Sequence, residues 1–128
     1  MRLLLDTHFV LAGVNQEMST RYPDFDRLLD SGVAESFVSV VSLWEIAIKA
    51  RLGKLVPRLP VEQIPDYLHT AHFQIITITV PHVIAVAKPE PPTRDPFDRL
   101  LLAQCQFETM QLVTVDRALA GHPLAFRP

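Results

Sequence analysis

A helix start is encoded in the stretch Arg94-Asp95-Pro96-Phe97-Asp98-Arg99-Leu100-Leu101-Leu102-Ala103-Gln104. Asp95 supplies the acceptor side chain that a helix N-cap needs, and Pro96 suits the first helical position. Asp98 then falls in the first turn, where the helix macrodipole favours a negative charge. An apolar face continues beyond it and predicts a helix that ends at about Glu108. The start of a helix is therefore enough to explain why Asp95 and Asp98 are acidic. A functional role for them depends on the other acids of the chain.

Outward from this helix, short apolar segments alternate with helix-like segments. The strand-like segments are residues 2–6, 36–41, 74–78 and 111–115, with a last short one near 125–127. The helix-like segments between them are residues 7–14, 24–30, 42–52, 61–72 and 79–87, besides the helix that opens at Asp95. This alternation is typical of a mostly parallel sheet with helices on both faces. We therefore expect an α/β fold with about five strands.

Composition bounds the class of protein. The chain has 128 residues, of which 48% are hydrophobic and 20% charged, so a disordered chain is excluded and a single domain over residues 1–128 is expected. The formal charge of −2 gives no overall electrostatic signature of nucleic-acid binding. The single cysteine, Cys105, excludes an internal disulfide and is expected to be a buried thiol. No signal peptide or membrane span is apparent, which favours a soluble, cytoplasmic protein.

Acids recur at the ends of the predicted strands. Asp6 follows the first strand, Glu45 follows the second, and Asp116 follows the late strand. Asp98 opens the helix that leads into that late strand. Ligands of open α/β sheets bind outside the carboxyl ends of the strands. We therefore expect these four carboxylates to converge at one edge of the sheet.

Each of these acids also has a local explanation. Ser42 and Glu45 have the spacing of a capping box, Asp116 suits the N-cap of a final helical turn, and Asp6 suits a turn at the end of a strand. Local capping does not explain why all four would face one crevice. Clustered carboxylates repel one another, and a hard divalent cation such as Mg²⁺ or Mn²⁺ relieves that repulsion. Such a site can activate water and stabilise charge on a phosphodiester.

Four blocks of the sequence resemble one family in order and spacing. They are Leu3-Leu4-Leu5-Asp6-Thr7-His8, Ser42-Leu43-Trp44-Glu45-Ile46-Ala47-Ile48-Lys49, Arg94-Asp95-Pro96-Phe97-Asp98-Arg99-Leu100-Leu101 and Leu112-Val113-Thr114-Val115-Asp116. Together they resemble PIN-domain proteins of the VapC type, the toxins of bacterial toxin–antitoxin pairs. The resemblance spans nearly the whole chain. It implies a three-layer α/β/α fold and a Mg²⁺- or Mn²⁺-dependent endoribonuclease.

The resemblance also implies roles for individual residues. It assigns the catalytic and metal-binding acids to Asp6, Glu45, Asp98 and Asp116. It assigns supporting roles to Thr7, Ser42 and Thr114, whose hydroxyls would orient the carboxylates or water, and to Asp95, as a cap or an outer acid. Its implied partners are an RNA substrate, a VapB-like antitoxin and a second copy of the chain in a homodimer, with no membrane. One departure is Thr93, where relatives with this block often carry a histidine.

Several cationic and aromatic residues lie beside these motifs. Arg94 and Arg99 could hold RNA phosphates or pair with nearby acids. Lys49 could extend that track or belong to a solvated helix face. Trp44 could stack on a base or serve as a core or interface aromatic. Among the five histidines, only His69 and His72 have a zinc-like spacing, and nothing around them supports a zinc site.

Competing functions remain. An aspartate-nucleophile phosphatase would need a second acid where His8 stands, and a phospho-receiver domain would need an acidic pair and a late lysine that the chain lacks. A non-catalytic module that binds protein or RNA is compatible with the sequence, although the intact set of acids argues against it. A housekeeping RNA-processing nuclease is also compatible.

Overall fold

The centre of the molecule is a four-stranded parallel sheet. The structure is a computed structural model that describes residues 1–127. The strands lie in the order β3-β2-β1-β4, so the first strand of the chain is interior. Leu4 lies opposite both Phe37 and Leu112 in the register. The strand bounds are β1 Arg2–Leu5, β2 Glu35–Ser39, β3 Gln74–Ile76 and β4 Gln111–Val113.

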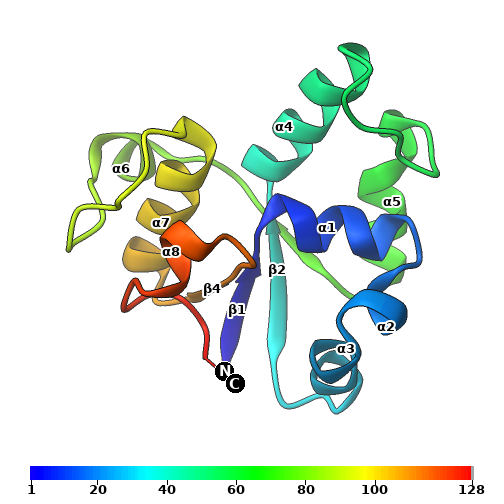
Figure 1. Cartoon of the computed structure of the whole chain (residues 1–128), viewed down its shortest axis with the longest axis horizontal. Helices are drawn as coiled ribbons and strands as arrows, with labels where there is room; N and C mark the ends of the chain where they lie inside the picture. The colour runs from blue at the N-terminus through cyan, green and yellow to red at the C-terminus, as the bar shows by residue number, and fades with distance from the viewer. Residues whose placement is uncertain (128) are drawn as a thin grey trace.

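Helices cover both faces of this sheet (Figure 1). Alternate residues of each strand point to opposite faces, so Leu3 and Leu5 enter one buried cluster while Leu4 enters the other. The cluster around Leu3 takes side chains from α1, α3 and α5, and the cluster around Leu4 takes them from α7 and α8. The expected α/β layering is therefore confirmed. The helices are α1 Thr7–Val14, α2 Met18–Arg21, α3 Pro23–Asp30, α4 Val40–Arg51, the 3₁₀ turn η1 Val61–Gln63, α5 Ile64–Thr70, α6 Val80–Ile84, α7 Pro96–Glu108 and α8 Arg117–Ala120.

The expected fifth strand does not form. The chain near Ala125 makes an isolated parallel bridge to Leu112, because the Leu112 and Phe126 N–H groups donate to Leu124 O and Leu112 O. The apolar pattern at 125–127 was therefore correct about the place of this segment beside β4. It was wrong about a strand, because the pairing stops after one bridge.

Two helix starts show how local chemistry sets the boundaries. Asp95 caps α7 as expected. Helix α4 starts earlier than expected, because Ser39 Oγ accepts the Val41 N–H at 3.1 Å and caps the helix before Val40. The β-branched residues after Ser39 were predicted to extend the strand, and the cap overrides that propensity.

Cys105 lies on the buried face of α7, in the core. Burial raises the pKa of its thiol, so the prediction of a buried thiol is confirmed. Among residues 1–127, no helix is both long and apolar enough to cross a bilayer.

Candidate active site

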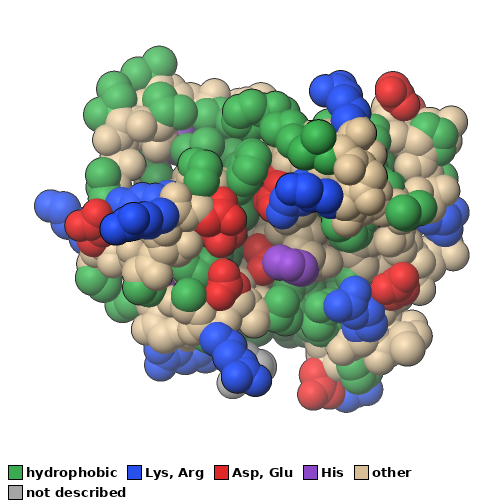
Figure 2. Space-filling view, turned by 45° about the horizontal axis from the view of Figure 1, so that its top comes forward, with side chains coloured by type: hydrophobic (Ala, Val, Ile, Leu, Met, Phe, Trp, Pro, Cys, Tyr) green, Lys and Arg blue, Asp and Glu red, His purple; other side chains and the backbone are tan. Residues whose placement is uncertain are grey.

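The ends of the strands and the starts of two helices direct four acids toward one edge of the sheet. Asp6 directly follows β1, and its N–H donates to Val113 O of β4 at 3.0 Å. Glu45 lies in the second turn of α4, which follows β2, and Asp98 lies in the first turn of α7. Asp116 is the residue that caps α8 after β4. The space-filling view shows acidic side chains gathered near the middle of one face, beside a histidine (Figure 2).

The electrostatics of Asp98 indicate that these acids share a field. Burial and, after it, the negative charges of four other carboxylates together raise the pKa of Asp98 from its ordinary value to about 7. Those carboxylates are, in decreasing order of effect, Asp95, Asp116, Glu45 and Asp6. The other three predicted acids therefore lie within interaction range of Asp98. Burial and these charges disfavour the ionised form of Asp98.

Capping uses only one oxygen of two of these acids. Asp6 Oδ1 accepts the Phe9 N–H at 3.1 Å and caps α1, while Asp116 Oδ1 accepts the Ala118 N–H at 2.9 Å and caps α8. The second carboxylate oxygen of each residue is not used by the cap. Capping and cation binding are therefore compatible at these positions, and the local explanation does not exclude the functional one.

Asp95 has the position and contacts of a cap. Its Oδ1 accepts the N–H groups of Phe97 at 2.9 Å and Asp98 at 3.4 Å. Its own N–H donates to Thr93 Oγ1 at 3.1 Å. Thr93 thus supports the turn that presents Asp98.

Glu45 is fixed by side chains from two helices. It is 5% exposed, and Thr7 Oγ1 donates to its Oε1 at 2.6 Å. Thr7 Oγ1 also lies 3.2 Å from Ser42 Oγ, and because Thr7 has one hydroxyl proton, Ser42 is the donor of that second bond. Lys49 forms an ion pair with Glu45 Oε2. The predicted capping box of Ser42 and Glu45 is wrong, since the cap is Ser39 and both residues lie inside α4.

Thr114 supports Asp116 as Thr93 supports Asp95. Its Oγ1 accepts the Asp116 N–H at 3.0 Å, which fixes the turn between β4 and α8. Thr7 therefore contacts the Glu45 carboxylate and Thr114 the backbone of Asp116, whereas Ser42 contacts the Thr7 hydroxyl.

The predicted cationic residues differ in how they are engaged. Arg99 donates to Thr93 O at 2.8 Å and pairs with Glu90 at 3.0 Å, so it fastens the loop before α7. Lys49 is engaged with Glu45 and does not extend a free basic track. Arg94 is exposed and, within residues 1–127, makes no hydrogen bond or ion pair.

Two residues that received little weight in the sequence lie at the rim. His8 Nδ1 is 3.8 Å from Asp6 Oδ2, and the hydrogen bond and charge of Asp6, together with the charge of Glu45, raise the pKa of His8. Its position two residues after a strand-end acid was the available signal. Trp44 is 58% exposed and lies edge-on to Phe97, with 5.6 Å between ring centroids, so it is not a core residue.

The donor set suits a hard divalent cation. All four predicted ligands are carboxylates, which Mg²⁺ and Mn²⁺ prefer, and a cation would offset the charge that raises the pKa of Asp98. Across residues 1–127, no three acidic, histidine or cysteine side chains meet closely enough to enclose an ion unaided. A cation here would share its coordination between these carboxylates and water, as Mg²⁺ usually does.

The comparisons with known proteins agree with this arrangement. The family model of the PIN domain matches residues 3–122, so the chain belongs to the PIN domain family. Among curated proteins, none matches the chain.

Solved structures share the fold at low sequence identity. A chain of a toxin–antitoxin complex from Klebsiella pneumoniae is 19% identical, with a TM-score of 0.64, and the match covers 98% of this chain and 97% of that one. A chain of VapBC2 from Rickettsia felis, bound to a DNA fragment from its promoter, is 16% identical, with a TM-score of 0.64 and coverage of 98% and 96%. At these identities the likeness shows the fold alone.

Proposed function

We propose that the protein is a Mg²⁺- or Mn²⁺-dependent endoribonuclease that hydrolyses RNA phosphodiesters at the carboxylate edge of its sheet. The observation that supports this most directly is the shared field of Asp6, Glu45, Asp98 and Asp116. These acids come from separate elements of a PIN fold, and burial together with the charges of the neighbouring carboxylates raises the pKa of Asp98 to about 7. A protein keeps such a cluster at a cost to its stability, and catalysis by a bound cation is the function that uses it.

Different residues of the chain would bind the cation, orient its ligands and bind the RNA phosphate. Asp6, Glu45, Asp98 and Asp116 hold the cation. When bound, it activates water and screens the charge that develops on the phosphodiester. Thr7 keeps the Glu45 carboxylate oriented through its 2.6 Å hydrogen bond. Asp116 is held by the Thr114 turn. The free guanidinium of Arg94 suits an RNA phosphate.

The proposed biological role is that of a toxin with a VapB-like antitoxin. Its support is the shared fold with chains of a toxin–antitoxin complex and of VapBC2. A cluster of acids of this kind suits a cationic side chain of an inhibitory protein, which would compete with the metal and with RNA. A housekeeping nuclease would lack such an inhibitor.

A homodimer is proposed through the outer surface of α6 and the residues after it. This surface is formed by Val80, Val83, Ile84 and Val86, which are 68%, 59%, 73% and 51% exposed. Four adjacent exposed aliphatic side chains form a patch of the kind that protein interfaces bury. A second copy of the chain offers the same patch in return.

The test is cleavage of a panel of structured RNAs by purified protein in EDTA, Mg²⁺ or Mn²⁺. Asp6→Asn and Asp98→Asn remove one charge each from the cluster and keep its shape. Asp30→Asn is the matched control, because Asp30 is an exposed acid at the end of α3. We expect metal-dependent cutting by the original protein and by Asp30→Asn, with cutting reduced by at least about a hundredfold in the two site variants.

The outcomes separate the alternatives. Cutting that survives both site substitutions indicates a contaminating nuclease and rejects the proposed site. Folded protein that binds Mn²⁺ and cuts none of the RNAs favours the binding-only module. Growth arrest when the chain is expressed in bacteria, and its absence for Asp6→Asn, would favour the toxin over a housekeeping nuclease.

A further inference from the structure

A second feature of the molecule adjoins the acidic edge. A cavity of about 670 Å³ opens between α3, the start of α1, the end of β4 and the C-terminal segment. This volume is within the range of small-molecule sites, roughly 300–1,000 Å³. The side chains around it are mostly apolar, and four are aromatic. We call it the aromatic cavity and define it by the rings of Phe9, Tyr22, Phe25 and Phe126.

Two wall residues of the aromatic cavity are bonded to the proposed metal-binding acids. Phe9 lines the cavity, and its N–H donates to Asp6 Oδ1 at 3.1 Å in the N-cap of α1. Thr114 lines it as well, and its Oγ1 accepts the Asp116 N–H at 3.0 Å. A group bound in the cavity could therefore contact Phe9 and Thr114, each of which is hydrogen-bonded to one of the acids. This continuity distinguishes the cavity from an isolated hollow of the surface.

Three of the four rings pack against one another, and the fourth, Phe126, is available to stack on a base. Phe9 packs against Tyr22, with centroids 4.3 Å apart, and edge-on against Phe25 at 5.1 Å. The Arg21 guanidinium lies 5.4 Å from the centroid of the Tyr22 ring. Phe126 is half-buried and, within residues 1–127, pairs with no other ring.

The charges at the mouth suit a polyanion. Arg21 and Arg127 both line the aromatic cavity and both are exposed. Arg21 contacts the Tyr22 ring and forms an exposed ion pair with Glu17 at 3.4 Å, and this pair is weak enough to exchange for a phosphate. Among the described residues that line the cavity, Asp24 is the one acid, and it pairs with Arg27. Apolar rings inside and guanidinium groups at the rim are the combination that binds single-stranded nucleic acid.

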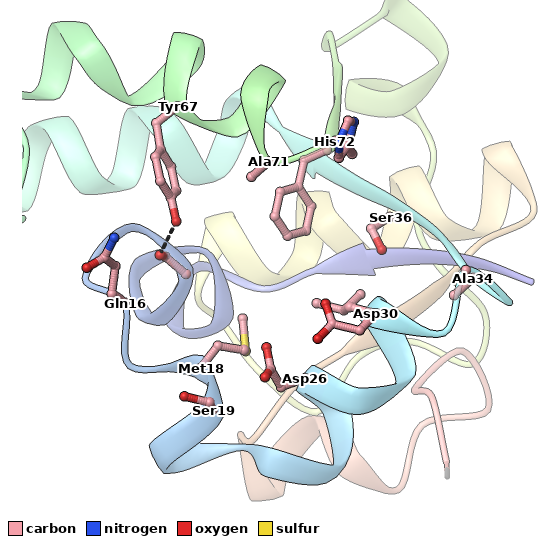
Figure 3. Close-up of a pocket in the computed structure, with 14 residues that line it drawn as sticks. Gln16, Met18, Ser19, Asp26, Asp30, Ala34, Ser36, Tyr67, Ala71 and His72 are labelled. Atoms are coloured by element: carbon pink, nitrogen blue, oxygen red, sulfur yellow. Dashed lines mark hydrogen bonds between the residues drawn. The ribbon is translucent and has the colours of Figure 1, made fainter.

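A cavity of similar size elsewhere lacks these features. It measures about 660 Å³ and lies by Ala34 and Ser36, at the start of β2. Asp26 and Asp30 extend from α3 along its wall, and the Tyr67 hydroxyl donates to Gly13 O across it (Figure 3). Two carboxylates with no arginine in the lining would repel a phosphate. The aromatic cavity is therefore the better of the two for RNA.

We infer that the aromatic cavity receives one nucleobase of the RNA next to the bond that is cut, with Phe126 as the stacking ring and Arg21 and Arg127 on the adjoining phosphates. This inference rests on the proposed nuclease function and adds a specificity site to it. The base that fits would set the preferred nucleotide at one position beside the scissile phosphate. Stacking on Phe126 would provide affinity for any base, and contacts between the cavity wall and the edge of the base would determine which base is preferred.

The test uses a library of hairpin RNAs with a randomised loop, cut in Mg²⁺ and sequenced at the cut ends. Phe126→Leu keeps the apolar bulk and removes the aromatic face. Phe107→Leu is the matched control, because Phe107 is an exposed ring on α7 that does not line the cavity. We expect Phe126→Leu to raise KM about tenfold at similar kcat and to relax the nucleotide preference at one position only. Phe107→Leu should leave both unchanged.

A second comparison separates stacking from a general loss of stability. An abasic nucleotide at the affected position should lower kcat/KM for the original protein by about the same factor as Phe126→Leu does. Combining the variant with the abasic RNA should cost little more, because both remove the same contact. Independent, multiplicative effects would overturn the inference, as would an unchanged nucleotide preference in Phe126→Leu. If the original protein cuts no RNA at all, the nuclease proposal fails and the inference fails with it.

Discussion

The Thr7 hydroxyl donates to Glu45 Oε1 at 2.6 Å and so ties the first residue of α1 to a buried carboxylate of α4. These residues are 38 positions apart in the chain. The two helices meet where β1 and β2 end, and the hydrogen bond fixes the orientation of the Glu45 carboxylate. A contact of this kind controls a metal site without contributing a ligand.

Replacing Thr7 should therefore impair the site and leave the fold intact. Thr7→Val has nearly the same volume and removes the hydroxyl, so Glu45 Oε1 loses its donor while Lys49 still pairs with Oε2. We expect Mg²⁺-dependent cleavage to fall about 10–100-fold, with a higher Mg²⁺ concentration needed for half-maximal rate. Thr7→Ser retains a hydroxyl and should recover most of the activity. Equal activity of Thr7→Val and the original protein would show that the hydrogen bond does not matter for catalysis.

The raised pKa of Asp98 predicts a pH dependence of the metal-free protein. Asp98 titrates near 3.8 when unfolded and at about 7 when folded, so between these values the folded state binds more protons. The free energy of unfolding should therefore decrease as pH rises through this interval and stay low above it. Urea unfolding in EDTA at about pH 5 and about pH 8 measures the difference.

Asp98→Asn should flatten this dependence, because asparagine does not ionise. Asp66→Asn, a change in an exposed acid at the start of α5, should leave it as it was. Adding Mg²⁺ at about pH 8 should restore stability to the original protein, since a bound cation stabilises the folded state by mass action. The same pH slope in Asp98→Asn would show that other groups cause it.

Local signals explain what the sequence predicted well. The start of α7 was predictable because its N-cap, Asp95, and its first residue, Pro96, are adjacent and both are typical of a helix start. The acids could be placed at one edge because parallel strands end on the same side of a sheet. The start of α4 was misjudged, because Ser39 and Ser42 are both plausible caps and only packing against Thr7 distinguishes them.

Features built from distant residues left no such signal. The aromatic cavity joins Phe9, Tyr22 and Phe25 to Phe126, more than a hundred residues away, and no local pattern links the C-terminal ring to the others. Nor does sequence spacing show that Arg99 fastens a loop while Arg94 stays free. The fifth strand was overestimated because its apolar pattern is real but too short to continue pairing beyond Ala125.

The two arginines beside Asp98 should differ in what they contribute. RNA binding can be measured without cutting in protein that carries Asp98→Asn. In that background Arg94→Ala should weaken binding of a single-stranded RNA and reduce the slope of log affinity against log salt by about 1. Arg99→Ala should instead lower the free energy of unfolding by about 1–2 kcal/mol, because it frees the Thr93 carbonyl and Glu90. If Arg99→Ala rather than Arg94→Ala reduced the salt slope, the phosphate contact would belong to Arg99 and this proposal for Arg94 would be wrong.

The exposed aliphatic side chains of α6 predict a self-association that one charge should abolish. Ile84 is 73% exposed, so Ile84→Asp should not disturb the core, whereas a buried interface would have to desolvate the new carboxylate. Light scattering after gel filtration should give the mass of a dimer for the original protein and of a monomer for Ile84→Asp. Val56→Asp is the matched control, since Val56 is 84% exposed in the loop after α4 and lies outside this patch. It should remain a dimer. If the original protein is a monomer at every concentration, the patch is not a homodimer interface; if Ile84→Asp stays dimeric, the interface lies on another surface.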